Sequence, residues 1–153
     1  NFFLITDALA PLVLLAQGIG RWGNFFNGEV YGKVIDNPSW QWFPFAVKIG
    51  NEWHHALFFY ESLLNILGFI LLLFIFFKFR KNFGIATGAY LVYYGLVRFF
   101  MEPLRDSEFI LQAGKLPISR VLSGVMVLAG ISIIVTVILL NKNKSKKQKT
   151  VLS

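Results

Sequence analysis

The sequence predicts an all-α, polytopic integral membrane protein: a helix bundle with about four spans in this chain. Of its 153 residues, 56% are hydrophobic and only 15% are charged. A soluble domain usually has about 45–50% apolar and about 25% charged residues. The apolar residues are also gathered into four long runs. Together these observations exclude a disordered chain, a coiled coil and an ordinary cytosolic enzyme.

The four apolar runs cover residues 2–19, 56–79, 85–101 and 121–140. A helix needs about 20 mainly apolar residues to cross a bilayer, and the second and fourth runs meet that standard. The first and third runs are shorter and carry polar residues. We nevertheless expect both to span, because a soluble chain of this size could hardly bury four such helices.

The basic residues predict the orientation of these spans. Residues 78–81 and 142–149 hold eight lysines and arginines and no acidic residue. Two spans separate these segments, so they lie on one side of the membrane, and the positive-inside rule makes that side cytoplasmic. We therefore predict a transmembrane domain over residues 1–141 and a basic, disordered cytoplasmic tail over 142–153. The net charge of +7 then reflects topology and contact with anionic lipid, with no nucleic acid as a partner.

The first external loop is rich in tryptophan: Trp22, Trp40, Trp42 and Trp53 all lie in or beside it. Tryptophan favours the membrane–water interface, where one end of the ring is apolar and the other is wet. We expect residues 38–49 to lie along the outer leaflet. Two prolines in that segment argue against a long helix there.

A first polar cluster follows the first span, with Arg21, Asn24, Asn27 and Glu29 inside nine positions. If the segment begins as a helix, the arginine and both asparagines share one face. The glycines at 18–23 also fit a dinucleotide-binding spacing, but that motif needs a preceding strand and a parallel sheet, so we reject it. Two interpretations stay open for the cluster: an ion pair that locks two helices, or a binding site.

A second cluster ends the third run. Arg98 and Glu102 share a helix face, Arg105 follows three positions later, and Pro103 is expected to disturb or end the helix. The charge argument puts both clusters on the same side of the membrane. Structural ion pairs would again explain them. Arginine forks also match phosphate oxygens, so our hypothesis is that Arg21 and Arg98 clamp a lipid phosphate at the outer leaflet.

Several chemistries are disfavoured. The chain has no cysteine, which excludes a disulfide framework, a thiolate metal site and a cysteine nucleophile of its own. The adjacent His54 and His55 have no partner at metal-ligand spacing, so we predict no metal and no cofactor. Tyr60 and Glu61 lie at the membrane rim, where an interfacial anchor with a snorkelling carboxylate is one explanation. The G-x-x-x-G at 84–88 fits either helix packing or a turn.

The polar segments together resemble a known family. The stretch R-W-G-N-F-F-N-G-E at 21–29, followed by Gly32, resembles the signature of prolipoprotein diacylglyceryl transferases. The resemblance extends to the histidine, tyrosine and glutamate within 55–61 and to the R-x-x-x-E-x-x-R pattern at 98–105. It covers nearly the whole chain and corresponds to a little over the C-terminal half of the family. Since the chain starts at Asn1 rather than methionine, we expect it to begin inside a longer protein.

The resemblance implies a bacterial cell-membrane enzyme with its active site facing the outer leaflet. Such an enzyme transfers the sn-1,2-diacylglyceryl group of phosphatidylglycerol to the lipobox cysteine thiol of a prolipoprotein, the first step of lipoprotein maturation. Its partners would be phosphatidylglycerol and prolipoprotein signal peptides. The nucleophile belongs to the substrate, so the absence of cysteine is no obstacle. The family's upstream His-Gly-Gly segment, the favoured general base, and the proline usual at position 56 are not present in this sequence.

The resemblance also implies roles for individual residues. Arg21 and Arg98 would hold the phosphate and Asn24 would donate a hydrogen bond to the headgroup. Glu29 and Glu102 would orient the arginines or the glycerol hydroxyls. The candidate catalytic residues are thus Arg21, Asn24, Glu29, Arg98 and Glu102, and the candidate phosphatidylglycerol-binding residues are Arg21, Arg98, Asn27, Gly32, Glu61 and Arg105.

The alternative is a non-enzymatic membrane subunit, with outer arginines and glutamates that line an anion path or bind lipid. The two classes differ in what they need from an arginine. An anion path depends on charge, so Arg21→Lys would preserve much of the function. An enzyme that grips a phosphate depends on the fork, which a point charge cannot replace.

Overall fold

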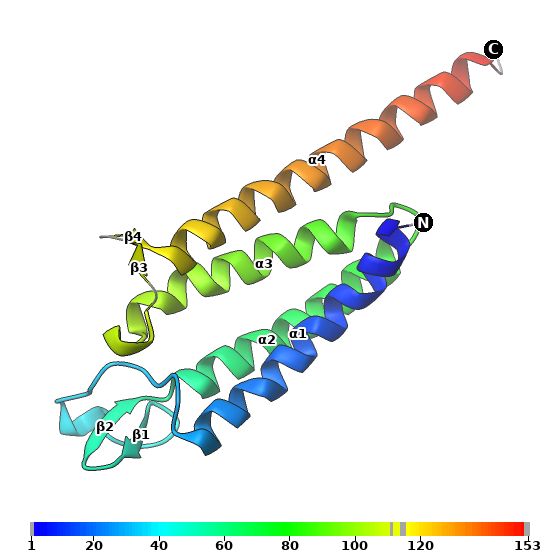
Figure 1. Ribbon diagram of the computed structural model, residues 1–153. Coiled ribbons are helices and arrows are strands. Elements are labelled where there is room, and N and C mark those ends of the chain that lie inside the picture. Colours follow the sequence, from blue (N-terminus) through cyan, green and yellow to red (C-terminus); the bar gives the residue numbers. More distant parts are fainter. Residues whose placement is uncertain (1, 111, 114–115, 152–153) are drawn as a thin grey trace.

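The computed structural model describes residues 2–110, 112–113 and 116–151. Its four helices are α1 (Phe2–Asn27), α2 (Leu57–Lys78), α3 (Ile85–Met101) and α4 (Ile118–Val151), which run roughly along one another (Figure 1). The pairs α1–α2 and α3–α4 pack most extensively, and α3 also contacts α1 and α2. The predicted helical membrane bundle is confirmed.

Three of these helices are long and apolar enough to cross a membrane: Phe2–Asn27, Leu57–Lys78 and the Ile118–Lys144 part of α4. The fourth predicted span, α3, has 17 residues. At 1.5 Å per residue it is about 25 Å long, slightly less than a hydrocarbon core of about 30 Å. The prediction of about four spans therefore corresponds to three full-length helices and one shorter helix packed among them.

Helix α1 extends eight residues beyond the apolar run, because the apolar run marks the membrane core and not the end of the helix. Pro11 lies buried inside it. The helix ends at Asn27 and is followed by Gly28, whose φ of 67° is left-handed, as is common for the residue that follows a helix. The Gly28 amide donates to the Phe25 carbonyl and the Glu29 amide to the Asn24 carbonyl. The extension carries Arg21 to the rim of the bundle as part of a rigid helix.

Small residues set the close contact between α3 and α4. A Cβ atom on Gly130 would lie 2.5 Å from the carbonyl oxygen of Gly88, and one on Gly88 would lie 2.9 Å from the Gly130 oxygen. Gly84 has a φ of 102° and immediately precedes α3. Both explanations of the G-x-x-x-G therefore apply, one to each glycine: Gly84 makes a turn and Gly88 allows helix packing.

Two short hairpins lie at the end of the bundle where α2 begins (Figure 1). Strands β1 (Ala46–Ile49) and β2 (Glu52–His55) pair antiparallel, as do β3 (Gln112–Ala113) and β4 (Leu116–Pro117). The sequence analysis did not predict these strands. It correctly excluded a long helix over 38–49, where the only helical piece is the 3-10 turn Pro38–Trp40.

The opposite end of the bundle is basic. The Asn141 side-chain amide donates to the Asn82 side-chain oxygen at 3.1 Å, which joins the α2–α3 turn to α4 next to both basic segments. Those segments lie at the same end, as the sequence predicts. The backbone of 142–151 continues α4 as helix, where a disordered tail is predicted. Extension of an already formed helix adds one hydrogen bond per residue, and lysine and glutamine are good helix formers.

Candidate functional site: an arginine cluster at the bundle end

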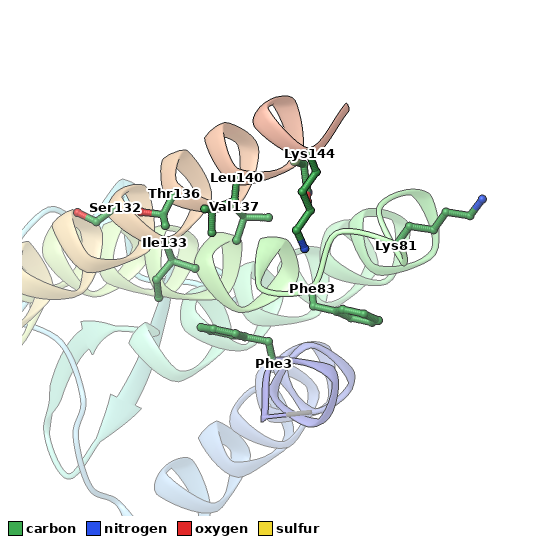
Figure 2. Close-up of a pocket in the computed structure, with 10 residues that line it drawn as sticks. Phe3, Lys81, Phe83, Ser132, Ile133, Thr136, Val137, Leu140 and Lys144 are labelled. Carbon is green, nitrogen blue, oxygen red and sulfur yellow. The ribbon is translucent and has the colours of Figure 1, made fainter. Parts of the chain in front are cut away.

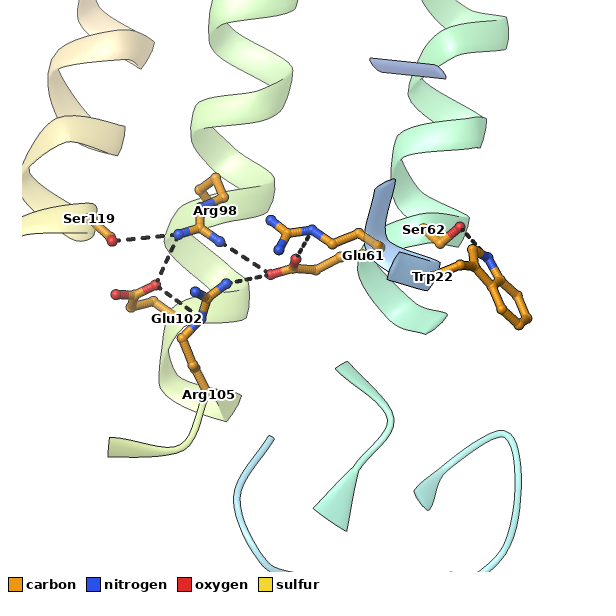
Figure 3. A network of polar contacts seen from close by, with 8 residues as sticks. Trp22, Glu61, Ser62, Arg98, Glu102, Arg105 and Ser119 are labelled. Carbon is orange, nitrogen blue, oxygen red and sulfur yellow. Dashed lines mark hydrogen bonds and ion pairs between the residues drawn. The ribbon is translucent and has the colours of Figure 1, made fainter. Parts of the chain in front are cut away.

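One buried carboxylate organises the polar end of the bundle. Glu61, in the second turn of α2, has a side chain only 2% exposed, and three guanidinium groups surround it (Figure 3). Arg21 of α1 reaches Glu61 Oε2 through Nε at 2.5 Å. Arg105 Nη2 and Arg98 Nη1 donate to Oε1 at 3.1 and 3.3 Å. The predicted convergence of Arg21 and Arg98 is therefore present, and Glu61 is the group they share.

A second carboxylate, Glu102, lies on the far side of two of these arginines. Its Oε2 is 3.6 Å from Arg98 Nη2 and 3.9 Å from Arg105 Nε. The Arg98 guanidinium also donates to the Ser119 hydroxyl at 3.5 Å. The Arg98 side chain thus lies between Glu61, Glu102 and the start of α4, so the cluster involves residues from all four helices.

The backbone after α3 brings Arg105 back toward the cluster. Helix α3 ends at Met101 and continues as a 3-10 turn, Glu102–Leu104, with Pro103 inside it, close to where the sequence predicts. The turn leads into an extended residue, Arg105, which pairs with Gly32 in an isolated antiparallel bridge. A Cβ on Gly32 would lie within 3 Å of His55 and of the Leu104 carbonyl. Gly32 therefore contributes by letting two backbones approach closely.

The charges of the cluster do not cancel. Three arginines face two glutamates, which gives a formal net charge of +1 (3 − 2). The glutamate side chains are 2% exposed, whereas those of Arg21 and Arg98 are 17% and 16% exposed. The accessible edge of the cluster is thus cationic. Burial, and next the neighbouring Arg98 guanidinium, lower the pKa of Arg105 from its ordinary value, though an arginine stays charged.

The Glu102 carboxylate is unusual because neither of its oxygens accepts a hydrogen bond from any residue that the structure describes. The two arginines near Oε2 lie at ion-pair distances rather than hydrogen-bond distances. A buried polar group without a hydrogen bond costs about 1–3 kcal/mol, and a charged one more. Such an acceptor beside a cationic edge is suited to a ligand that carries both a negative charge and a hydroxyl donor.

Three predicted site residues lie apart from this cluster. Asn27 and Glu29 are exposed, and Asn24 is half-buried beside a small cavity that Glu29 and Tyr31 also line. Among the described residues, none of their side chains makes a polar contact with the arginines. The reason is helical geometry, because each step of three residues along an α-helix leaves the side chain about 60° short of a full turn. The shared face expected for Arg21, Asn24 and Asn27 therefore drifts by about 120° over six residues.

One member of the site, Ser119, was not among the predicted residues. It stands one residue into α4, where nothing distinguishes it from other serines. Glu61 was a predicted binding residue, but its position at the centre of the arginines depends on three helices meeting, which no spacing along the chain reveals. Nearby, Trp22 donates through Nε1 to the Ser62 hydroxyl at 3.1 Å and packs edge-on against Phe58. These contacts fix α1 to α2 beside the cluster.

These features define a class: a polytopic helical membrane protein with a cationic arginine cluster at one end of the bundle. The sequence pattern of the prolipoprotein diacylglyceryl transferase family matches residues 1–136. A phosphatidylglycerol–prolipoprotein diacylglyceryl transferase of Clostridium novyi (strain NT) is 38% identical over 96% of this chain and 58% of that protein. Proteins of that name from Finegoldia magna and Synechocystis sp. are 41% and 39% identical, covering 86% and 94% of this chain and 50% and 53% of their own lengths. The chain therefore belongs to the prolipoprotein diacylglyceryl transferase family, as the sequence predicts, and spans about half the length of these relatives.

Proposed function

We propose that the protein transfers the diacylglyceryl group of phosphatidylglycerol to the cysteine thiol of a prolipoprotein. The observation that carries this proposal is the convergence of three arginines on Glu61, with Glu102 beside two of them, which leaves a net charge of +1. An anionic headgroup that enters at the exposed edge meets the forks of Arg21 and Arg98 together. The names of the relatives, and membership of their family, support the same activity.

The reaction replaces a carbon–oxygen bond with a carbon–sulfur bond. The thiol gives its proton to a general base, for which the family resemblance favours the upstream His-Gly-Gly segment, and the sulfur attacks the glycerol carbon of the diacylglyceryl group to form a thioether. The bond from that carbon to the phosphate oxygen breaks, and glycerol phosphate leaves with the electron pair. Arg21 and Arg98 stabilise the charge on the departing phosphate, and preorganised donors of this kind contribute about 10²–10³ in rate each. The cysteine is supplied by the substrate.

Glu102 accounts for a preference for this lipid. Its buried oxygens accept no hydrogen bond from the described residues, and the terminal glycerol of phosphatidylglycerol offers hydroxyl donors next to the phosphate. The Ser119 hydroxyl, held near Arg98, is a further polar group at this edge. A headgroup with a phosphate and a neighbouring diol matches both the cationic edge and the unsatisfied acceptor.

The orientation follows from charge and aromatic residues. The basic end carries residues 78–81 and 142–144, and the positive-inside rule assigns it to the cytoplasm. The arginine cluster then faces the outer leaflet of the bacterial cell membrane, where a translocated signal peptide and phosphatidylglycerol meet. Trp22, Trp40 and Trp42 are exposed at that end, as suits an interfacial belt. In this scheme residues 1–141 form the transmembrane part of the transferase.

The test uses the full-length protein in phosphatidylglycerol-containing micelles with a lipobox peptide and mass detection of the modified cysteine. We expect Arg21→Lys and Arg98→Lys each to lower the transfer rate at least 100-fold, because a point charge cannot replace the fork. The matched control is Arg120→Lys: Arg120 lies at the same end but stacks over Phe99 outside the cluster. Absence of any cysteine modification by the unaltered protein would refute the transferase.

The same variants separate the alternative function. If Arg21→Lys and Arg98→Lys keep most of the activity of the protein, charge alone is sufficient and an anion path is favoured. If both variants still bind phosphatidylglycerol but no thioether forms in any version of the protein, the site is a lipid-binding module.

A further inference from the structure

We propose that a groove at the basic end of the bundle binds an anionic phospholipid of that leaflet, at a site separate from the arginine cluster. The groove lies between α1, the turn that joins α2 to α3, and the C-terminal half of α4 (Figure 2). It measures about 570 Å³, within the range of about 300–1,000 Å³ that ligand pockets occupy. The proposed transfer reaction does not use it.

The groove is mainly apolar, although Ser132, Thr136 and Asn141 also line it, and it is cationic at its mouth. Ile133, Val137 and Leu140 of α4 form one wall and Phe3 of α1 faces them, as Figure 2 shows. Lys144 lies one helical turn beyond Leu140. From Ile133 to Lys144 the helix rises about 16 Å, at 1.5 Å per residue. That rise is close to half of a hydrocarbon core of about 30 Å, so the groove extends over about one leaflet.

Polar residues lie along the groove as well as at its end. Ser132 and Thr136 alternate with the apolar residues of α4, and Asn141 and Lys144 follow Leu140 toward the surface. The Lys144 ammonium points into the groove, whereas the Lys81 side chain, also in the lining, extends away from it (Figure 2). An acyl chain would lie along the α4 wall, with its phosphate near Lys144. Lysine stems also cover apolar surface while their charged ends reach the headgroup level.

The positive charge at the mouth has no acidic partner. Among the described residues, Lys81 and Lys144 form no salt bridge. Asp7 is the one acidic residue at this end, and it is buried and committed to the start of α3. Its carboxylate accepts from the Gly84 and Thr87 amides at 2.6 and 2.8 Å. The charge of the groove is therefore left for an external anion.

A second copy of the chain is a poor source of that anion. The other seven acidic residues lie at the arginine-cluster end or in the loops beside it: Glu29, Asp36, Glu52, Glu61, Glu102, Asp106 and Glu108. Copies in one membrane share the same orientation, so a neighbour brings its own basic end to this groove. Like charges at close range repel, whereas each basic residue near an anionic leaflet gains about 1 kcal/mol. The charge distribution thus favours lipid.

The experiment is photo-crosslinking of the full-length protein in phosphatidylcholine nanodiscs that hold a small fraction of phosphatidylglycerol with a diazirine in its acyl chain. Peptide mass spectrometry is expected to find the label on residues 132–141. We expect Lys81→Gln with Lys144→Gln to reduce this label about 25-fold, since each lysine contributes about a factor of five. Lys142→Gln, on the same helix but outside the groove, is the matched control. Labelling near Arg98 serves as an internal reference that the double variant leaves unchanged.

Two outcomes would overturn the proposal. Equal labelling of 132–141 by a diazirine phosphatidylcholine would mean ordinary annular lipid without headgroup selection. Absence of label on 132–141, with label elsewhere, would mean that protein covers the groove. A further variant, Val137→Trp, keeps both lysines but fills the groove, and it should also reduce the label. Unchanged thermal unfolding of each variant shows that the fold is intact, and the readout is independent of transfer activity.

Discussion

The substitution Glu61→Gln tests whether one carboxylate holds the arginine cluster together. It keeps the size and shape of the side chain and removes its negative charge, so the net charge of the cluster rises from +1 to +2. Three guanidinium groups lose their common carboxylate, and the new amide group faces them as a donor, in a place where Glu61 is 2% exposed. Removing one partner of a buried ion pair costs about 3–5 kcal/mol. We therefore expect a loss of that size in the free energy of unfolding.

The measurement is denaturant unfolding of the full-length protein in mixed micelles. Glu52→Gln is the matched control: Glu52 is in a strand at the same end, but its side chain is 67% exposed, so its loss should stay within about 0.5 kcal/mol. Adding Arg105→Gln to Glu61→Gln restores the net charge and should recover part of the loss, with a coupling energy of about 0.5–3 kcal/mol. A Glu61→Gln protein as stable as the unaltered one would refute the reasoning.

Three other predictions concern the rest of the bundle. Gly130→Ala should lower the free energy of unfolding by about 1–3 kcal/mol, because the new Cβ would lie 2.5 Å from a backbone oxygen. In the same helix, Gly124 faces open space, so Gly124→Ala should raise the free energy of unfolding by about 0.5–1 kcal/mol. Asp7→Ala leaves two amides at the start of α3 without their acceptor. It should therefore speed hydrogen exchange at these amides and lower the free energy of unfolding by about 1–3 kcal/mol. Unchanged exchange there would contradict the capping role. Burial lowers the pKa of His55 in the folded protein below 6.5. The unfolded chain therefore takes up a proton at this histidine more readily than the folded protein does. The stability that is present above pH 6.5 is lost as the pH drops through the folded pKa. His55→Gln should flatten this decline in unfolding measurements between pH 7 and pH 5, and an equally steep decline would count against it.

The sequence predicted the features that depend on solvent. Twenty apolar residues require a hydrocarbon environment, so α2 and α4 follow from length and composition. The location of the two basic segments at one end of the bundle follows from the even number of spans between them. Those two arguments were enough to bring Arg21 and Arg98 to the same end of the bundle, although 77 positions separate them in the sequence.

The sequence did not predict the features that depend on tertiary contact. Strands of two and four residues are too short to show a reliable alternation, so the hairpins had no signal. The apolar run at 2–19 could not show that α1 continues to Asn27, since the last turns lie at the polar rim. The central position of Glu61 results from α1, α2 and α3 meeting there. Locally, a snorkelling carboxylate at the same position explained it equally well.

A structural ion pair and an anion-binding site are not exclusive explanations for this cluster. Lipid tails are as apolar as leucine, so helices in a bilayer associate through close packing and polar contacts rather than through the hydrophobic effect. Here Glu61 joins three helices, and it also fixes three guanidinium groups in one orientation before any ligand arrives. Preorganised charges need no rearrangement when a phosphate develops charge. As a consequence, Glu61→Gln should lower both the free energy of unfolding and the transfer rate. Arg98→Lys keeps the charge, so it should lower the transfer rate far more than the free energy of unfolding.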